Sequence, residues 1–281
     1  MKKSTKLILI LILSSIVMTS CSQTIDLEKD KKDINYNFTN GILKYKSKPF
    51  TGKVESHYQN GQLQSKGSSK EGKRDGNFEQ YFENGKLQGK GSYKVGEKDG
   101  IFEEYFKNSK LKSKEFYIGG KEDGIWELYL ENGQLESKGP YKGGKKEGVW
   151  VEYFGNGKPK SKSSYKEGKQ DGVVELYLEN GQLQFKRSYK GGIQDGVWEE
   201  YFGNGKLESR GSFKGGSEDG VWEFYFENGQ LQSKGSFKEG EKDGVWEIYF
   251  EDGKLSKKES YVKGYKDEGL EQVGSPFKKN N

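Results

Sequence analysis

The sequence predicts an all-β fold, an elongated single antiparallel sheet of tandem β-hairpins. Three observations predict it: a period of 24 residues, an Asn-Gly pair at the same place in most periods, and apolar residues that alternate along the flanking segments. The apolar residues repeat every two positions rather than every 3.6, and glycine recurs too often for helices. We therefore expect each period to form a strand, a tight turn, a second strand and a looser turn into the next unit.

The period is marked by a glycine that recurs every 24 residues without a gap, and an acidic residue precedes it in every unit after the first. The glycines are Gly52, Gly76, Gly100, Gly124, Gly148, Gly172, Gly196, Gly220 and Gly244. They divide residues 52–267 into nine repeats, which follow an N-terminal cap over 41–51 and precede a C-terminal tail over 268–281. Such an array buries a little surface in each unit and needs no large single core.

The Asn-Gly pair predicts a two-residue type I′ turn, which requires positive φ at both residues. In the unit that starts at Gly124, this turn would place Leu130 opposite Leu135, Glu127 opposite Lys138 and Trp126 opposite Gly139. Because side chains alternate along a strand, we expect two distinct faces. One face would carry Trp126, Leu128, Leu130, Leu135 and Tyr141, and the other Ile125, Glu127, Tyr129, Glu136 and Lys138.

Two kinds of cross-strand pair recur in this register. Opposite charges face one another, which supports a sheet and needs no catalytic explanation. These pairs are Glu79–Lys90, Glu103–Lys114, Glu199–Arg210, Glu223–Lys234 and Glu247–Lys258. Trp126, Trp198 and Trp222 lie opposite a glycine, so we expect each ring to cover the bare backbone of its own hairpin. In these pairs a large side chain lies opposite a small one. Val174 opposite the bulky Arg187 follows this rule with the sizes reversed, whereas Trp246 opposite Glu259 does not follow it.

The composition argues against a disordered chain and against a nucleic-acid binder. Apolar residues make up only 30%, but aromatic residues make up 14%, and disordered segments are poor in aromatics. The formal charge is +5, of which Lys2, Lys3 and Lys6 supply three charges near the N-terminus. The remaining acids and bases are interleaved and form no basic stripe. We therefore expect no nucleic-acid partner.

The first residues resemble a bacterial lipoprotein signal peptide. A basic start is followed by the apolar run Leu7 to Met18 and by small residues that end at Cys21, the single cysteine of the chain. The resemblance implies a signal peptide over 1–20, lipidation of Cys21 and a membrane anchor through that lipid, with the outer membrane favoured over the inner where two exist. A plain signal peptide is the alternative. Residues 21–40 are polar and are expected to form a tether.

The repeat itself resembles a bacterial variant of the MORN repeat. The resemblance rests on the segment from Asp123 to Leu135, on the closing Tyr141-Lys142-Gly143-Gly144-Lys145, and on the opening Pro49 to Val54. It covers residues 49 to about 267. Bacterial members carry an antitoxin-like label, and eukaryotic members suggest scaffolding, dimerisation and contact with membrane lipids.

The chain offers no catalytic residues, no metal ligands and no cofactor site that the sequence can identify. His57 is the single histidine and Cys21 the single cysteine, so there is no second histidine or second cysteine to complete a zinc site or a nucleophile–base pair. The glycine–lysine pairs lack the strand–loop–helix setting of a phosphate-binding loop. We therefore expect a non-enzyme with no cofactor, with an unrecognised enzyme as the alternative.

These observations favour a cell-envelope lipoprotein that acts as a non-catalytic repeat scaffold for an unidentified protein partner. The expected interaction surface is a row of exposed aromatic residues on the Glu/Lys face, Tyr129, Tyr153, Tyr177 and Tyr201. Self-association through the apolar sheet face is a second expectation. Two alternatives stay open: a cell-wall or lipid-headgroup module in which aromatic rings form cages for cationic or sugar ligands, and an antitoxin-like protein that neutralises a partner.

Overall fold

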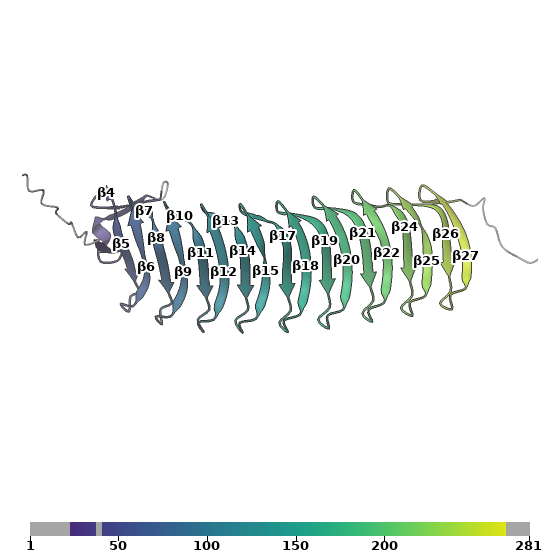
Figure 1. The fold of residues 1–281 in the computed structure, drawn as a ribbon, viewed down its shortest axis with the longest axis horizontal. Coiled ribbons are helices and arrows are strands. Elements are labelled where there is room, and N and C mark those ends of the chain that lie inside the picture. The colour runs from purple at the N-terminus through teal and green to yellow at the C-terminus, as the bar shows by residue number, and fades with distance from the viewer. Residues whose placement is uncertain (1–22, 38–40, 268–281) are drawn as a thin grey trace, which may run out of the picture.

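The computed structural model describes residues 23–37 and 41–267. Paired strands stand side by side along one long axis and form a single extended sheet (Figure 1). The two long strands of successive hairpins are β5 (Gly52–His57) and β6 (Leu63–Lys70), β8 (Gly76–Tyr81) and β9 (Leu87–Lys94), β11 (Gly100–Tyr105) and β12 (Leu111–Ile118), β14 (Gly124–Tyr129) and β15 (Leu135–Lys142), β17 (Gly148–Tyr153) and β18 (Pro159–Lys166), β19 (Lys169–Tyr177) and β20 (Leu183–Lys190), β21 (Ile193–Tyr201) and β22 (Leu207–Lys214), β24 (Gly220–Tyr225) and β25 (Leu231–Lys238), and β26 (Glu241–Tyr249) and β27 (Leu255–Val262). The predicted fold class is confirmed.

Short strands fill the looser turns between hairpins. They are β7 (Lys73–Arg74), β10 (Glu97–Lys98), β13 (Lys121–Glu122), β16 (Lys145–Lys146), β23 (Ser217–Glu218) and β28 (Tyr265–Lys266), whereas β19, β21 and β26 run through this region without a break. The looser turn needs positive φ at two successive residues, and Gly143 and Gly144 take φ of 56° and 87°. Glycine adopts this conformation without steric cost, which explains its recurrence here.

The tight turn differs from the predicted type I′ turn. In the unit at Gly124, the Leu130 amide donates to the Gln134 carbonyl and the Gly133 amide to the Leu130 carbonyl, both at 2.8 Å. Gly133 has φ of 92°, but Asn132 is not among the residues with positive φ. This is a three-residue loop, a type I turn closed by a glycine bulge. The Asn132 Oδ1 supports it by accepting from the Gln134 amide at 2.8 Å.

A β-bulge corrects the register that the longer loop would otherwise shift. Leu128 pairs with Ser137 and Tyr129 with Leu135, which leaves Glu136 as the extra residue. The predicted pairs Trp126–Gly139 and Glu127–Lys138 are therefore confirmed, whereas the predicted pair Leu130–Leu135 is wrong. Since directly paired residues share a face, Leu135 lies on the Tyr129 face and not on the Trp126 face.

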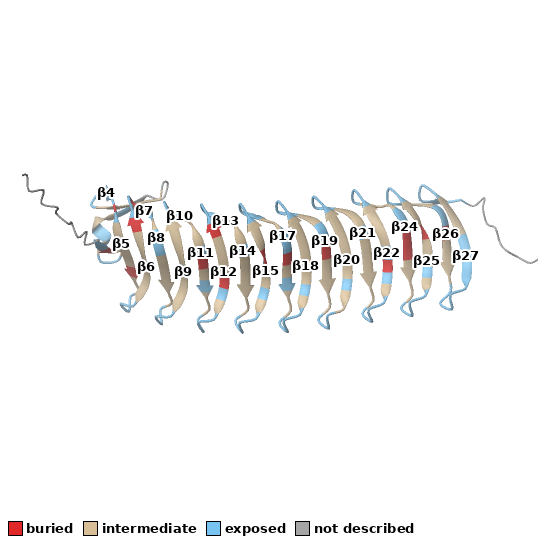
Figure 2. Ribbon diagram, in the orientation of Figure 1, coloured by how far each residue is buried: buried red, intermediate tan, exposed pale blue. Residues whose placement is uncertain are grey.

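The buried residues lie mainly along the middle of the strands, and the turns at both rims are exposed (Figure 2). The recurring core position is the second residue after the period-marking glycine, on the face that we call the aromatic face. It is buried in five units, at Phe102, Trp150, Val174, Trp222 and Trp246. Rings from successive strands meet edge to face on this side, as Phe102 does with Tyr117 at a centroid distance of 5.3 Å.

The N-terminal segment is structured where the sequence predicts a tether over 21–40. β1 (Thr24–Asp26) pairs in parallel with β5 and covers the first edge of the sheet, with Ile25 only 1% exposed. A 3₁₀ turn (Lys31–Asp33) then leads into a small sheet of β2 (Ile34–Asn37), β3 (Ile42–Tyr45) and β4 (Lys48–Pro49). The described part of the predicted tether therefore belongs to the cap. Its pairing with β5 covers backbone groups that an edge strand would otherwise expose unpaired.

The opposite edge of the sheet is β27. Its aromatic-face positions carry Lys257 and Glu259, where β25 has Ser233 and Gly235. Charged residues at these positions disfavour the addition of another strand. Cys21, the predicted signal peptide over 1–20 and the tail over 268–281 lie outside the described residues.

Candidate interaction surfaces

The predicted tyrosine row lies on the face opposite the aromatic face, and its rings are half-buried rather than exposed. The hydroxyls of Tyr129, Tyr177 and Tyr201 donate to the glutamate two residues earlier, at 2.9, 2.6 and 2.9 Å. Tyr153 has Val151 at that place. Burial raises the pKa of Tyr129 and of Tyr201 to about 12, and the hydrogen bond to the glutamate is the second cause of this increase. These phenols therefore stay protonated at physiological pH, with hydroxyls already engaged inside the protein.

The predicted opposite charges face one another, but the ion pairs extend beyond single hairpins. Lys66 contacts Glu79 at 2.8 Å and Lys90 contacts Glu103 at 2.9 Å, and in each pair the lysine belongs to the preceding unit. Glu79 is opposite Lys90 within its own hairpin, as predicted. The charges therefore form a ladder along the array and connect neighbouring units.

Glu223 is the most enclosed member of this ladder. It accepts from the Arg210 Nε of the preceding unit, from the Tyr225 hydroxyl at 2.7 Å and from Lys234 at 2.9 Å. Burial alone would raise its pKa, but the bonds from Arg210, Tyr225 and Lys234 lower the pKa of Glu223 to about 2. This carboxylate is a structural anion, held by partners that are all part of the sheet.

A row of exposed aliphatic residues was not predicted, although its signal is visible in the sequence. The residue after the period-marking glycine is isoleucine or valine in seven consecutive units, and its exposed fraction runs from 37% to 55%. The members of this row are Ile101, Ile125, Val149, Val173, Val197, Val221 and Val245. They share a face with the glutamate and tyrosine rows, two and four residues further on. We call this set the aliphatic row.

On the aromatic face, the ring that covers a glycine belongs to the following unit. A Cβ added at Gly139 would overlap the indole of Trp150, and one added at Gly235 would overlap Trp246. The prediction that each ring covers the glycine of its own hairpin is wrong on this point, although the register pairs are right. The packing of each ring onto the preceding unit also explains why Glu259 can lie opposite a tryptophan. Trp246 packs onto Gly235, so Glu259, its partner within the same hairpin, need not be small.

Hydrogen bonds reinforce this contact between units. The indoles of Trp150, Trp222 and Trp246 donate to the carbonyls of Pro140, Ser212 and Ser236, at 3.0, 3.2 and 3.2 Å. Arg187 stands where most other units have glycine, and its guanidinium lies 3.9 Å from the centroid of Trp198. The array is therefore held together by contacts that each run from one unit back to the one before it.

Ring pairs on the aromatic face already hold cations supplied by the chain. The Lys98 ammonium lies 4.6 Å from the Phe102 centroid and 4.4 Å from that of Tyr117. Lys146 has the same relation to Trp150 and Tyr165, and Lys242 to Trp246 and Tyr261. A general cage for external cations, repeated in every unit, is therefore not what these rings form.

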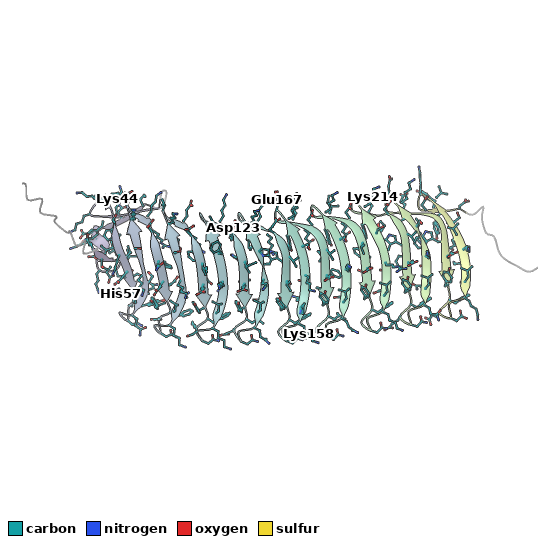
Figure 3. The ribbon with its side chains drawn as sticks, in the orientation of Figure 1. Lys44, His57, Asp123, Lys158, Glu167 and Lys214 are labelled. Carbon is teal, nitrogen blue, oxygen red and sulfur yellow. The ribbon has the colours of Figure 1, made fainter. Side chains whose placement is uncertain are left out.

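The two long rims of the array are held by side chains that reach from one turn to the next (Figure 3). Lys158 lies at the rim of the tight turns, and its ammonium donates to the Asn180 carbonyl at 2.9 Å. Asp123 and Glu167 lie at the other rim. The Asp123 carboxylate accepts from the Gly143 amide at 3.1 Å. This bond gives the recurring acid before each period-marking glycine a structural role in the next turn.

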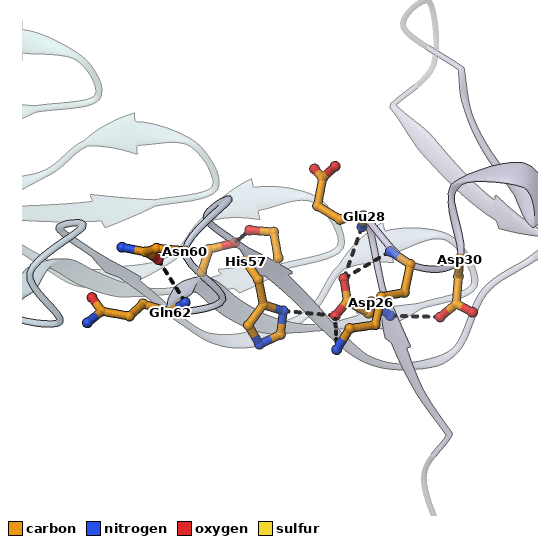
Figure 4. A network of polar contacts seen from close by, with 9 residues as sticks. Asp26, Glu28, Asp30, His57, Asn60 and Gln62 are labelled. Atoms are coloured by element: carbon orange, nitrogen blue, oxygen red, sulfur yellow. Dashed lines mark hydrogen bonds and ion pairs between the residues drawn. The ribbon is translucent and has the colours of Figure 1, made fainter.

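His57 and Asp26 connect the cap to the first hairpin (Figure 4). The His57 Nδ1 is 2.8 Å from the Asp26 carboxylate, which also accepts from the Glu28 and Lys29 amides. Across the described residues, no group of three or more His, Cys, Asp and Glu side chains is arranged to hold a metal ion. Within the same residues, no helix has the length and apolarity to cross a membrane.

A cavity of about 920 Å³ lies between the cap and the first repeats. Leu27 and Leu43 line it from the cap, and Phe78, Lys73 and Arg74 line it from the repeats. The Arg74 guanidinium lies 5.2 Å from the ring centroids of both Phe78 and Tyr93, so it occupies the place that Lys98 takes in the next unit.

The 24-residue unit matches a known repeat family along most of the chain. The model of the MORN repeat variant matches residues 50–71, 74–94, 98–118, 122–142, 146–167, 170–190, 194–214, 218–239 and 242–263. The chain belongs to the MORN repeat variant family. These nine matches follow the nine hairpins, and MORN repeats are typically modules for interaction with proteins or membrane lipids.

Wider comparisons add no functional information about this MORN repeat protein. No curated protein matches it. Among solved structures it aligns with the crystal structure of TcdB2-TccC3 at 10% sequence identity and a TM-score of 0.16. That alignment covers 79% of this chain but 14% of the other, so the MORN chain spans about a seventh of that protein's length.

Proposed function

We propose that this protein is a non-catalytic scaffold of the bacterial cell envelope that binds a protein partner along several consecutive repeats. The observation that carries the proposal is the aliphatic row, seven half-exposed isoleucine and valine residues at equivalent positions of neighbouring hairpins. The residue paired with each member on the second strand is Phe116, Pro140 or a serine, so the exposed aliphatic side chains recur once per hairpin. Exposed apolar residues gathered along one face are typical of interaction sites in soluble proteins. The proposed surface is thus extended and periodic rather than a pocket.

The neighbouring rows give this surface its polar surroundings. Ion pairs between Glu and Lys or Arg lie two residues from the aliphatic row, and the half-buried tyrosine rings lie two residues further. An apolar strip with a polar rim is the usual anatomy of a protein interface. Complete burial of a half-exposed valine contributes roughly 1 kcal/mol, so affinity would accumulate over several units.

Capture of partners from the native envelope tests this proposal. The full chain is compared with a triple variant, Val149→Glu, Val197→Glu and Val221→Glu, which introduces three charges into the aliphatic row. We expect at least a tenfold loss of the captured envelope protein. The control variant carries Lys142→Gln, Lys190→Gln and Lys214→Gln, which changes the net charge equally at exposed strand ends. Equal capture by both variants would exclude the aliphatic row as the interface.

We also propose that the chain is anchored through a lipid on Cys21, on the outer membrane in a bacterium with two membranes. The support is the basic start, the apolar run and the small residues that end at Cys21. Cys21→Ala or globomycin treatment should leave an unprocessed precursor that no longer incorporates a palmitate analogue. Normal processing of the Cys21→Ala chain would favour a plain signal peptide instead.

A further inference from the structure

The row of edge-to-face rings on the aromatic face is interrupted once in its N-terminal half. Tyr93 contacts Phe102 at a centroid distance of 5.4 Å, and Tyr141 contacts Trp150 at 5.0 Å, in both cases across the junction of two units. At the junction between these two, the described residues include no ring contact from Tyr117 to Trp126. The two rings on the C-terminal side of this gap, Trp126 and Tyr141, form their own pair at 5.0 Å.

The gap follows from a substitution at the position that is usually glycine. Glu115 stands where Gly91 and Gly139 accommodate the next ring, so Trp126 has no bare backbone to cover. Unlike Trp150, whose exposed fraction is 7%, Trp126 is only half-buried. Its indole nitrogen is enclosed but has no hydrogen-bond partner, whereas the indole of Trp150 donates to a carbonyl of the preceding unit.

A second substitution removes the cation that neighbouring ring pairs hold. Glu122 stands where the units on either side have Lys98 and Lys146, the two lysines whose ammonium groups lie 4.2–5.1 Å from ring centroids. The Trp126–Tyr141 pair has the same edge-to-face arrangement, with 62° between the ring planes. This unit therefore retains the rings but has a carboxylate in place of the ammonium.

The charges around the pair favour a cation. Glu115 accepts from the Tyr117 hydroxyl at 2.8 Å, and neither Glu115 nor Glu122 forms an ion pair with any of the described residues. The basic groups of the flanking pairs are already engaged: Lys98 donates to the Tyr117 hydroxyl at 3.3 Å, and Lys146 lies over Trp150. Two carboxylates beside two ring faces attract an ammonium both electrostatically and through the ring quadrupoles.

We propose that the Trp126–Tyr141 pair, with Glu115 and Glu122 beside it, binds a primary alkylammonium group. The neighbouring units supply the argument for this ligand class, because each holds the same chemical group, the end of a lysine side chain, between equivalent rings. The carboxylates provide acceptors for the ammonium hydrogens that the rings cannot provide. The site is independent of the aliphatic row, which lies on the opposite face of the sheet.

Titration of the ¹⁵N-labelled full chain with n-butylammonium chloride tests the site through its five indole resonances. The Trp126 signal is assigned with Trp126→Phe, and sodium chloride at equal ionic strength serves as the salt control. We expect a saturable shift of the Trp126 signal at millimolar concentrations. Glu122→Gln should weaken this response at least threefold. Glu122→Lys should abolish it, because the new ammonium would occupy the rings as Lys98 and Lys146 do in their units.

The matched control is Glu218→Gln. Glu218 occupies the equivalent position beside Trp222, but Trp222 is only 4% exposed and its indole is bonded, so this variant should bind like the unaltered chain. Equal shifts of all five indoles, or undiminished binding by Glu122→Lys, would overturn the proposal. Tighter binding of tetramethylammonium than of n-butylammonium would also overturn it, since that cation has no hydrogen to donate to a carboxylate.

Discussion

Trp150 packs against the backbone of Gly139, a residue of the preceding hairpin, and its indole donates to the adjacent Pro140 carbonyl at 3.0 Å. Each such contact belongs to two units at once. A single two-stranded hairpin is only marginally stable in water, so the contacts between units carry much of the stability of the array. Substitutions at the glycine and deletions of whole units test this directly.

Gly139→Ala should destabilise the protein by about 1–3 kcal/mol, because the added methyl group would overlap the Trp150 ring and force it away from the sheet. Urea unfolding followed by tryptophan fluorescence measures the effect. Gly67→Ala is the control: the nearest atom to its added Cβ is a Phe78 carbon at 3.4 Å, which is ordinary contact. If the two variants lost equal stability, the packing of the ring on Gly139 would not be the cause.

The tight turn can be tested in both directions. Gly181 has φ of 93°, so Gly181→Val should cost more than about 1 kcal/mol. Ser109 occupies the equivalent position with φ of 68°, and Ser109→Gly should therefore stabilise the chain by up to about 1 kcal/mol. Thermal unfolding measures both changes. A neutral Gly181→Val variant would contradict the left-handed conformation at this turn.

Deletion of a whole unit should be tolerated when the new junction still pairs a glycine with a tryptophan. Removal of residues 220–243 places Gly211 next to Trp246, so that one equivalent contact takes the place of the two that Gly211 makes with Trp222 and Gly235 with Trp246. The new junction is intact, and the unfolding midpoint should change by no more than roughly 4 °C. Removal of residues 124–147 instead places Glu115 against Trp150 and should lower the midpoint further. Equal midpoints for the two deletions would show that the junction residue is unimportant.

Acid should weaken the ladder at Glu223. Its pKa is lowered in the folded chain from 4.5 to about 2, so its contribution is fully present above about pH 4.5 and is lost as the pH falls towards 2. The contribution is at most about 3 kcal/mol. In Glu223→Gln, the free energy of unfolding should depend less steeply on pH between 4.5 and 2 than in the unaltered chain, as urea midpoints would show. Arg210→Gln removes one of the partners that lower this pKa and should reduce the slope in part; superimposable profiles for all three chains would contradict the assignment.

The sequence predicted correctly those features that follow from its periodicity, the hairpins and most of the strand register. The 24-residue period determines the hairpins, and alternation correctly places Glu127 opposite Lys138. The turn type was missed because Asn-Gly suits both a type I′ turn and a type I turn with a glycine bulge, and Asn132 adopts the second. The resulting bulge at Glu136 restores the register, so an incorrect turn still led to correct pairs in the rest of the strands.

The contacts between units were less accessible from the sequence. The strand register places Trp126 between two residues at the position that is usually glycine, Gly139 in its own hairpin and Glu115 in the preceding one. The register alone does not determine against which of the two the ring packs. The structured part of residues 23–37 was missed because its apolar alternation is short, Ile25 with Leu27 and then Ile34 with Tyr36, and a run of charged residues separates the two pairs. The aliphatic row has a clear signal at the residue after each recurring glycine, but an exposed row and a buried row look alike in a sequence.

The backward lean of the tryptophans gives the array a direction of growth. During synthesis, each newly made hairpin would supply the ring that covers the glycine position of the hairpin before it. Every shorter chain would therefore end in a hairpin whose glycine position is not yet covered. On the last hairpin, Lys257 and Glu259 form an ion pair at the positions that a further ring would have to cover, where β25 has Ser233 and Gly235. New repeats could therefore enter by duplication within the array, while its last hairpin would have to keep its own sequence.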